Sequence, residues 1–392
     1  MKIIDRKKCL ICKGRLWCGL KYCPIILKKS IKAKVLKKIE NKDSIEGFSY
    51  NLFVSRYNYP RIPIGVLTSS DKLVNHPKDW IQNKFTIKDI VFNRVNLINA
   101  KKSTTIVGLD NPIIEAALSK RPTYVYIKIK KIKTNLCRFY PDYYPMGPST
   151  RLLEIEFLEE PKIPRIVEKL YYDQIKAEDA VYKLYEKDFD FYKISEVLSG
   201  GLLGINKRLV PTRWAITAVD SIIGKKLKKE VMQYKLADKY MYFEGSLLGN
   251  YIFAVYIPYP FSFEYTEIWM PHTTWNLTNR ILKTTDHEFY FTQPPKEPKS
   301  AGAYYAARLA FLEFLKKNKI NGSFVVLRVI TRDYYLPLGV WVVRECARKA
   351  TENPISFNDM SDLITFLRNR NKLILNMLEN SNIIKQTKLV EF

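Results

Sequence analysis

The chain contains no run of about 18 apolar residues, which is the length that a membrane-spanning helix requires. Its amino terminus also lacks the apolar core of a secretory signal peptide. These absences predict a cytoplasmic protein without a membrane partner. Hydrophobic residues nevertheless make up 47% and aromatic residues 13% of the 392 residues, which indicates a folded protein with more than one domain.

Cysteine is scarce, and four of the six cysteines lie within the first 23 residues, at Cys9, Cys12, Cys18 and Cys23. Their spacing, C-x2-C-x5-C-x4-C, predicts a four-cysteine zinc site, because four nearby thiolates suit a tetrahedral metal. Gly14 and Gly19 each follow a cysteine closely, where a tight turn around a metal often needs a positive φ. Two disulfides and an iron–sulfur cluster are the alternatives.

Acidic residues are also under-represented, with 39 Asp and Glu against 65 Lys and Arg and a formal net charge of +26. Such an excess repels itself unless a polyanion is near, which favours nucleic acid or an anionic membrane surface as a partner. The alternative is a generally basic proteome, because the scarcity of Gln and His resembles the composition of heat-adapted proteins.

The positive charge is concentrated near the amino terminus. Residues 1–50 hold 14 Lys and Arg against Asp5, Glu40, Asp43 and Glu46, a net charge of +10. Within this region, apolar residues spaced four apart predict a helix over Ile25–Glu40 whose remaining faces carry lysines. A zinc site followed by a basic helix could present cations to phosphates, and a solvated helix face is the alternative.

The pattern of periodicities predicts an α+β fold, with a mixed core of sheet and helix beside the small N-terminal zinc module. Strands are expected at Tyr124–Lys130, Tyr251–Tyr256, Phe324–Ile330 and Gly339–Val343. Helices are expected at Ile166–Lys187, Tyr304–Lys317 and Phe357–Leu378, the last capped by Asn358. The expected domains are 1–45 with the zinc module and basic helix, 46–250, 251–380, and a tail of residues 381–392.

A glycine-rich segment followed by cations is a candidate phosphate-binding loop. Its candidate ligand residues are Gly200, Gly201, Gly204, Lys207 and Arg208. The segment is not a P-loop, because G-x4-G-K-[ST] is absent. The alternative is a glycine-rich turn between a helix and a basic strand.

Arg213 and Asp220 are the candidates for chemistry on a phosphodiester, with Arg213 as a phosphate clamp and Asp220 as a ligand of Mg²⁺ or Mn²⁺. The alternatives are a structural stack of Arg213 with Trp214 and a pairing of Asp220 with Arg213. Other acidic residues are scattered, at Glu264, Glu267, Asp286, Glu288, Asp333 and Glu345. No E-x-K nuclease core, G-x-S-x-G elbow or H-E-x-x-H motif is present. The sequence therefore leaves enzymatic activity open.

The last seven residues fit the pattern Q-x-x-h-x-x-aromatic, with Gln386, Leu389 and Phe392 at the defining positions. Such a peptide can form one 3₁₀ turn that places both apolar side chains in one pocket. The replication sliding clamp, PCNA, binds peptides of this type. The tail therefore predicts the clamp as a partner.

Several segments together resemble the archaeal Nre family of DNA-repair proteins. The resemblance is carried by CLICKG and WCGLKYCP near the amino terminus, SRYNYP at Ser55–Pro60, PMGPS at Pro145–Ser149, LSGGLLG and RLVPTRWAITAVD within Leu198–Asp220, AGAYYAARLAFLE at Ala301–Glu313 and PLGVWVVRE at Pro337–Glu345. It covers nearly the whole chain and implies repair of damaged DNA, with the carboxy-terminal peptide on the clamp. The tail has one terminal aromatic residue, whereas the fullest clamp-binding pattern has two.

The sequence thus predicts a DNA-repair factor that binds zinc and DNA and is tethered to the clamp. A metal-dependent nuclease or phosphoesterase activity is a further hypothesis within it. The alternative is a non-catalytic RNA-binding or RNA-modifying zinc protein, because zinc modules, lysines and exposed tyrosines serve RNA equally well.

Overall fold

The structure, a computed structural model, describes residues 6–20, 22–107, 112–132 and 145–390. The chain divides into two compact units, and the boundary falls within helix α9 (Thr212–Val231). Pro24–Ile223 form one, called here the barrel unit, and Met1–Cys23 with Gly224–Phe392 form the other, the sheet unit. This division differs from the expected domain boundaries, since the cysteine segment groups with the second half of the chain.

Five strands of the barrel unit close into a barrel in the order β1-β2-β3-β5-β4. The strands are β1 (Ser44–Val54), β2 (Arg61–Ser69), β3 (Ile98–Thr105), β4 (Thr123–Ile129) and β5 (Ser149–Phe157). All neighbours are antiparallel except β3 and β5, which are parallel. Alternate residues of β2, Ile62, Ile64 and Val66, are fully buried, as expected when one face of a strand lines a barrel. The predicted strand at Tyr124–Lys130 is confirmed as β4.

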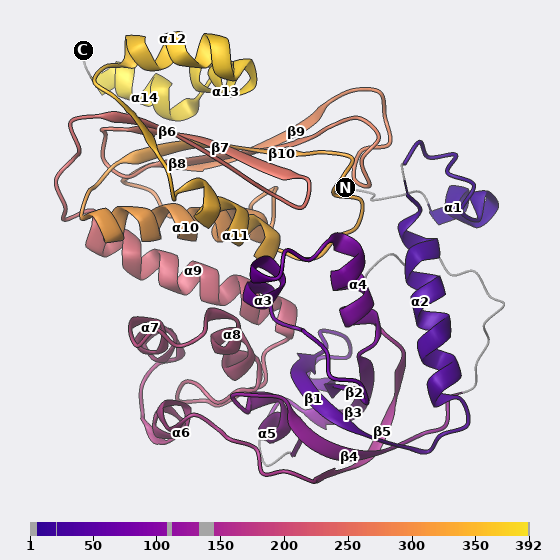
Figure 1. Ribbon diagram of the computed structural model, residues 1–392. Helices are drawn as coiled ribbons and strands as arrows, with labels where there is room; N and C mark the ends of the chain where they lie inside the picture. The colour runs from indigo at the N-terminus through magenta and orange to yellow at the C-terminus, as the bar shows by residue number, and fades with distance from the viewer. Residues whose placement is uncertain (1–5, 21, 108–111, 133–144, 391–392) are drawn as a thin grey trace. The chain divides into compact units, whose positions relative to one another are not determined.

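The barrel unit also contains α2 (Pro24–Ile39), α3 (Pro77–Gln82), α4 (Ile87–Val95), α5 (Pro112–Leu118), α6 (Arg165–Tyr172), α7 (Ala177–Glu186) and α8 (Phe191–Ser199). Helix α5 packs against β1, β2, β4 and β5 (Figure 1). The predicted helix at Ile25–Glu40 is confirmed as α2. The predicted helix at Ile166–Lys187 is instead two helices, because Asp173 turns to an extended conformation after α6.

The sheet unit is built on a six-stranded mixed sheet in the order β11-β6-β7-β10-β8-β9. The strands are β6 (Tyr240–Leu247), β7 (Asn250–Ile257), β8 (Phe263–Trp269), β9 (Leu282–Glu288), β10 (Ser323–Ile330) and β11 (Ile355–Phe357). Strands β8 and β10 are parallel neighbours. The strands predicted at Tyr251–Tyr256 and Phe324–Ile330 are confirmed as β7 and β10.

Helices cover both faces of this sheet (Figure 1). One face carries α10 (Gly302–Asn318) and α11 (Trp341–Ala350), and the other carries α12 (Met360–Arg370), α13 (Lys372–Glu379) and α14 (Asn382–Val390). Because both faces are covered, every residue of β10 is buried. The predicted helix at Tyr304–Lys317 is confirmed as α10. No described helix is both long and apolar enough to cross a membrane.

Two predicted elements were wrong in this unit. Gly339–Val343 was predicted as a strand, but α11 begins at Trp341, and its buried residues include Cys346, Ala347 and Ala350 at helical spacing. Phe357–Leu378 was predicted as one helix capped by Asn358, but Phe357 ends β11 and Asp359 is the cap of α12. The helix then breaks at Asn371, whose side chain caps α13. The mixed α+β class is confirmed.

Candidate functional site

The cysteine segment begins with α1 (Arg6–Cys12) and continues as a tight turn. Lys13, Gly14 and Leu16 have φ of 46°, 94° and 61°, and Gly19 has 73°, so the predicted positive φ of both glycines is confirmed. Burial by itself would raise the pKa of the Cys12 thiol. Hydrogen bonds from backbone N–H groups outweigh burial and lower this pKa, and they come from Trp17, Gly14, Arg15 and Leu16.

An array of N–H groups around one sulfur is the environment in which a thiolate is stable, and thiolates are the form in which cysteine binds metals. None of the five described cysteines forms a disulfide. Among the described residues, no group of three or more His, Cys, Asp or Glu side chains is gathered tightly enough to hold a metal ion. The donor set fits zinc in its chemistry, and the four-cysteine site stays a prediction.

The cysteine segment is seated on the rest of the sheet unit. A Cβ added at Gly19 would lie 2.9 Å from Nδ1 of His272, so only glycine fits this approach. The rings of Tyr22 and Tyr335 lie 5.2 Å apart. Gly19 also helps to line a pocket at the carboxyl ends of β8 and β10, with Met270, Pro271, Thr331, Arg332 and Asp333.

The glycine-rich segment joins α8 to α9 and folds tightly onto itself. Gly201 and Gly204 have φ of 72° and 91°, and a Cβ at Gly201 would lie 2.7 Å from the backbone carbon of Arg208. Lys207 donates to the carbonyl of Gly204 at 3.3 Å, and its Nζ lies 4.9 Å from the ring centre of Tyr171. These glycines therefore have a steric role in a turn between two helices. The alternative from sequence expected a basic strand after the turn, but helix α9 follows it.

Arg213 and Asp220 both lie on α9 but in different environments. Arg213 is exposed, whereas Asp220 is 1% exposed. Seven residues separate them, which is about 10 Å along a helix. The predicted phosphate clamp therefore lies at the surface, whereas the predicted metal ligand is buried about two turns further along the same helix.

Trp214, next to Arg213 on α9, lies near Tyr59 of the β1–β2 loop. The rings of Tyr59 and Trp214 lie 6.3 Å apart, and Cζ of Arg56 lies 5.4 Å from the ring centre of Tyr57. The three rings are strongly exposed, Tyr57 at 67%, Tyr59 at 52% and Trp214 at 50%. With the exposed Arg61 beside them, the aromatic–arginine patch consists of Arg56, Tyr57, Tyr59, Arg61, Arg213 and Trp214.

Two hydrogen bonds hold the two parts of this patch in place. The backbone N–H of Val54, at the end of β1, donates to Oγ1 of Thr212, the first residue of α9, at 2.9 Å. The N–H of Leu209 donates to the carbonyl of Ile106, just after β3, at 3.0 Å. Sequence reasoning noted SRYNYP and RLVPTRW separately, and no spacing in the sequence indicated that they would meet.

Apart from Asp333, the scattered acidic candidates have structural partners in the sheet unit. Glu267 forms an ion pair with Arg328, and Glu345 forms one with Arg348 at 2.8 Å. The carboxylate of Asp286 accepts hydrogen bonds from the backbone N–H groups of Lys299 and Ser300 at 2.7 and 2.9 Å. Each of these contacts explains why the carboxylate is there without a catalytic role.

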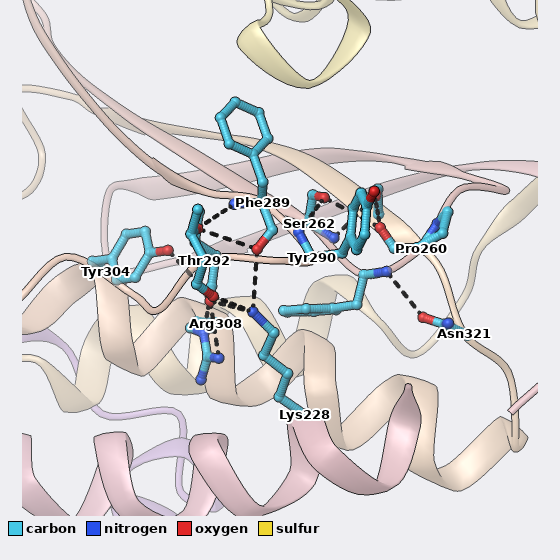
Figure 2. A network of polar contacts seen from close by, with 12 residues as sticks. Lys228, Pro260, Ser262, Phe289, Tyr290, Thr292, Tyr304, Arg308 and Asn321 are labelled. Atoms are coloured by element: carbon cyan, nitrogen blue, oxygen red, sulfur yellow. Dashed lines mark hydrogen bonds and ion pairs between the residues drawn. The ribbon is translucent and has the colours of Figure 1, made fainter. Parts of the chain in front are cut away.

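Glu288 is the most enclosed of these acids. It forms ion pairs with Arg308 and, at 3.0 Å, with Lys228, and the Tyr304 hydroxyl donates to it at 3.3 Å. Lys228 projects from α9 and also donates to the backbone carbonyls of Phe289 and Thr292 (Figure 2). This network joins β9, α9 and α10 within the sheet unit.

Glu264 anchors the start of the carboxy-terminal helix. The backbone N–H of Asn382 donates to its carboxylate at 2.7 Å, and the Ser381 hydroxyl donates at 3.3 Å. Burial raises the pKa of Glu264, and the bonds from the start of α14 offset this in part. A carboxylate at a helix N-terminus is favourable because the helix dipole is positive there.

The predicted clamp-binding residues lie at the end of α14. Gln386 is half-buried on this helix, and Leu389 lies one turn further on. Phe392 lies outside the described residues. In the described part of the tail, Asn382–Val390 are α-helical, and the 3₁₀ turn that such a peptide can form in a pocket of the clamp stays a prediction.

Two family models together match most of the chain. The model described as the N-terminal part of archaeal Nre matches residues 17–276, and the model of the C-terminal part matches residues 291–392. No solved structure shows significant similarity.

Curated relatives match along nearly their full length. The chain is 32% identical to "DNA repair protein NreA" of Archaeoglobus fulgidus, with 98% of each chain covered. It is 31% identical to "DNA repair protein NreB" of the same organism, over 96% of this chain and 97% of the relative. It is also 32% identical to "DNA repair protein NreA" of Haloferax volcanii, over 82% of this chain and 80% of the relative. By these matches, the chain belongs to the archaeal Nre family.

Proposed function

We propose that this protein is a DNA-repair factor that binds DNA through a cationic surface, holds a structural zinc ion and is recruited to the sliding clamp by its tail. The observation that carries the proposal is its similarity, at 31–32% identity over most of its length, to relatives named as DNA-repair proteins. A role in DNA repair follows from these names, and the finer parts rest on the residues below.

DNA binding is supported by the net charge of +26 and by the aromatic–arginine patch. Arginine suits phosphate because its planar donors can contact two oxygens at once. Such binding should weaken steeply as salt rises, because each phosphate contact releases a counterion. A titration of labelled DNA at several salt concentrations tests this, and an affinity independent of salt would contradict it.

Zinc is supported by the four cysteines and by the N–H groups around the Cys12 sulfur. Bound zinc would join α1 to the turn that follows it, a short segment with little core of its own. Elemental analysis of freshly purified protein should find one zinc per chain. A Cys12→Ser/Cys18→Ser variant should lack this metal, and a metal-free wild-type protein would remove the zinc proposal.

Recruitment to the clamp is supported by Gln386, Leu389 and Phe392. The anchor at Glu264 lies at residues 381 and 382, so a deletion of residues 388–392 leaves it in place. This deletion should abolish binding to the clamp and leave DNA binding unchanged. A matched control is Lys385→Ala, which changes an exposed residue outside the three motif positions. Loss of clamp and DNA binding together would contradict the modular arrangement.

Nuclease or phosphoesterase activity with Asp220 and Arg213 remains a hypothesis within this proposal. The burial of Asp220 and its distance from Arg213 favour a binding role over a hydrolytic one. Incubation of labelled DNA substrates with the protein and Mg²⁺ or Mn²⁺ tests the activity. Turnover that disappears in Asp220→Asn, with unchanged folding, would establish it.

The alternative function is RNA binding or RNA modification by a zinc protein. Competition among duplex DNA, single-stranded DNA and RNA at one salt concentration separates the two functions. The proposed function predicts that DNA competes better than RNA. A preference for structured RNA, without clamp binding, would reverse the ranking.

A further inference from the structure

We propose that the aromatic–arginine patch and the adjoining β2–β3 surface of the barrel bind single-stranded DNA, with bases stacked on Tyr57, Tyr59 and Trp214. The inference rests on the proposed DNA binding and names both the form of DNA and the surface that takes it. Three independent observations within the barrel unit support it: the topology of the barrel, the exposure of the rings and the distribution of charge.

The barrel has the strand order and strand directions of an OB-fold. Strands β1, β2 and β3 form an antiparallel meander, β3 pairs in parallel with β5, and β4 closes the barrel between β5 and β1. Helix α5 lies between β3 and β4 in the chain, as a helix often does in this fold (Figure 1). OB-folds bind oligonucleotides on the face of strands 2 and 3 and on the loop between strands 1 and 2. One fold hosts many functions, so the exposed side chains of this barrel decide what it binds.

The β1–β2 loop of this barrel is Ser55–Pro60, and it presents Tyr57 and Tyr59 at 67% and 52% exposure. Trp214, 50% exposed, extends this set of rings from the start of α9. Rings exposed to this extent contribute little to the core, whereas they offer flat faces to a ligand. Unpaired bases have free π-faces, which stacked base pairs of a duplex do not, so such rings favour a single strand.

Three segments that meet at this surface carry cations and no acidic residues. Three segments, Gly47–Ser70, Ile90–Val107 and Val197–Val219, contain no Asp or Glu and together contain eight Lys and Arg. They meet at the bond between Val54 and Thr212, at the bond between Leu209 and Ile106, and in the β2–β3 ladder, where Arg61 is opposite Thr105. Cations on segments that lack acids complement a phosphate backbone.

The β2–β3 face continues the patch. Phe53 of β1 and Lys101 of β3 both lie opposite Gly65 of β2, and Nζ of Lys101 lies 5.0 Å from the ring centre of Phe53. Glycine is required between them, because a Cβ at Gly65 would lie 2.6 Å from the carbonyl oxygen of Ala100. The result is a ring of β1 and a cation of β3 side by side across β2, and β2 and β3 are the strands that an OB-fold uses for binding.

The test measures binding of a labelled oligo-dT of about 20 nucleotides and of a duplex of equal length by fluorescence anisotropy, at about 0.1 M salt. The wild-type protein should bind the single strand more tightly. Each of Tyr59→Ala and Trp214→Ala should weaken single-strand binding about 5- to 150-fold, the loss of one stacked base. The matched control is Tyr172→Ala, which removes a 79% exposed tyrosine of α6 in the same unit.

Unchanged circular dichroism and melting of the variants establish that they fold. Equal binding of single strand and duplex by the wild type, or patch variants that bind as tightly as the control, would overturn the inference while leaving DNA binding intact. Absence of any DNA binding would instead remove the proposed function itself. Tighter binding of an oligo-U RNA than of oligo-dT would overturn the assignment of DNA as the ligand.

Discussion

Replacement of Glu288 by Gln should destabilise the sheet unit strongly, because Glu288 is a structural counterion. Its side chain is 0% exposed, and those of its partners Arg308 and Lys228 are 1% and 12% exposed. The substitution keeps the shape of the side chain but removes the only carboxylate known to pair with Arg308 among the described residues. An uncompensated buried charge costs about 3–5 kcal/mol of unfolding free energy.

For a unit of roughly 150–250 residues, that loss lowers Tm by about 6–20 °C. Thermal melting followed by near-UV circular dichroism measures it. The matched control is Glu230→Gln in the same unit, whose pair with Lys316 leaves both side chains 33% exposed and should contribute at most about 1 kcal/mol. The double variant Glu288→Gln/Arg308→Met should recover part of the loss, since it also removes the stranded cation.

The same variant distinguishes a structural from a catalytic Glu288. Replacement of a catalytic carboxylate would change Tm little, whereas replacement of a structural one lowers Tm. A Tm within about 2 °C of wild type would refute the reasoning.

Three further predictions concern other groups. Burial alone would raise the pKa of Asp190, but its hydrogen bond to His76 and the nearby charges of His76 and Lys78 hold this pKa well below its usual range. Wild-type stability should therefore fall as pH drops below about 4, and Asp190→Asn should remove that part of the pH dependence of Tm. Parallel curves of Tm against pH for the wild type and the variant would contradict this prediction. Burial raises the pKa of Cys346 to about 12, so iodoacetamide at neutral pH should not modify this cysteine. The four N-terminal cysteines should react only after a chelator removes zinc. If peptide mass mapping finds these four as reactive without chelator as with it, the zinc site is contradicted. Gly201→Ala should cost about 1–3 kcal/mol of unfolding free energy, measured as a lower Tm, because φ of Gly201 is 72°. Gly200→Ala should cost less, because φ of Gly200 is −69°. Equal losses in the two variants would refute this reason.

Elements with strong periodicity could be predicted from sequence. The apolar residues of α10 recur at helical spacing, and the buried Val125, Ile127 and Ile129 of β4 alternate with more exposed residues, so both were assigned correctly. The run at Gly339–Val343 was misassigned, because a short β-branched apolar run is compatible with either a strand or a buried helix. The break at Asn371 was missed because a side-chain cap inside a helical pattern is visible only in its hydrogen bonds.

The composition of the site was harder to predict than the fold. Arg213 and Trp214 were recognised as candidates, but their neighbour Tyr59 lies far away in the sequence, and only the pairing of β1 with β2 and the Val54–Thr212 bond bring it near. Contacts between residues so far apart in the chain produce no characteristic spacing in the sequence. The partners of the acidic residues were equally hard to predict, because the sequence does not indicate that the start of α14 donates a hydrogen bond to Glu264.

The zinc and clamp predictions have a different basis. The spacing of the cysteines and the pattern of the last seven residues are local, so the sequence suggests them directly. The structure adds the N–H groups around Cys12 and the anchor of α14. The first identifies Cys12 as a residue to replace, and the second shows which part of the tail can be deleted.

Photo-crosslinking tests the central claim most directly, namely that DNA is held on the barrel unit. A single-stranded oligonucleotide carrying 5-iodouracil is bound to the full-length protein and irradiated, and crosslinked peptides are identified by mass spectrometry. The account predicts crosslinks to Tyr57, Tyr59 and Trp214, lost when an excess of unlabelled single strand competes. Crosslinks confined to the sheet unit, or spread evenly over lysine-rich surfaces, would contradict it.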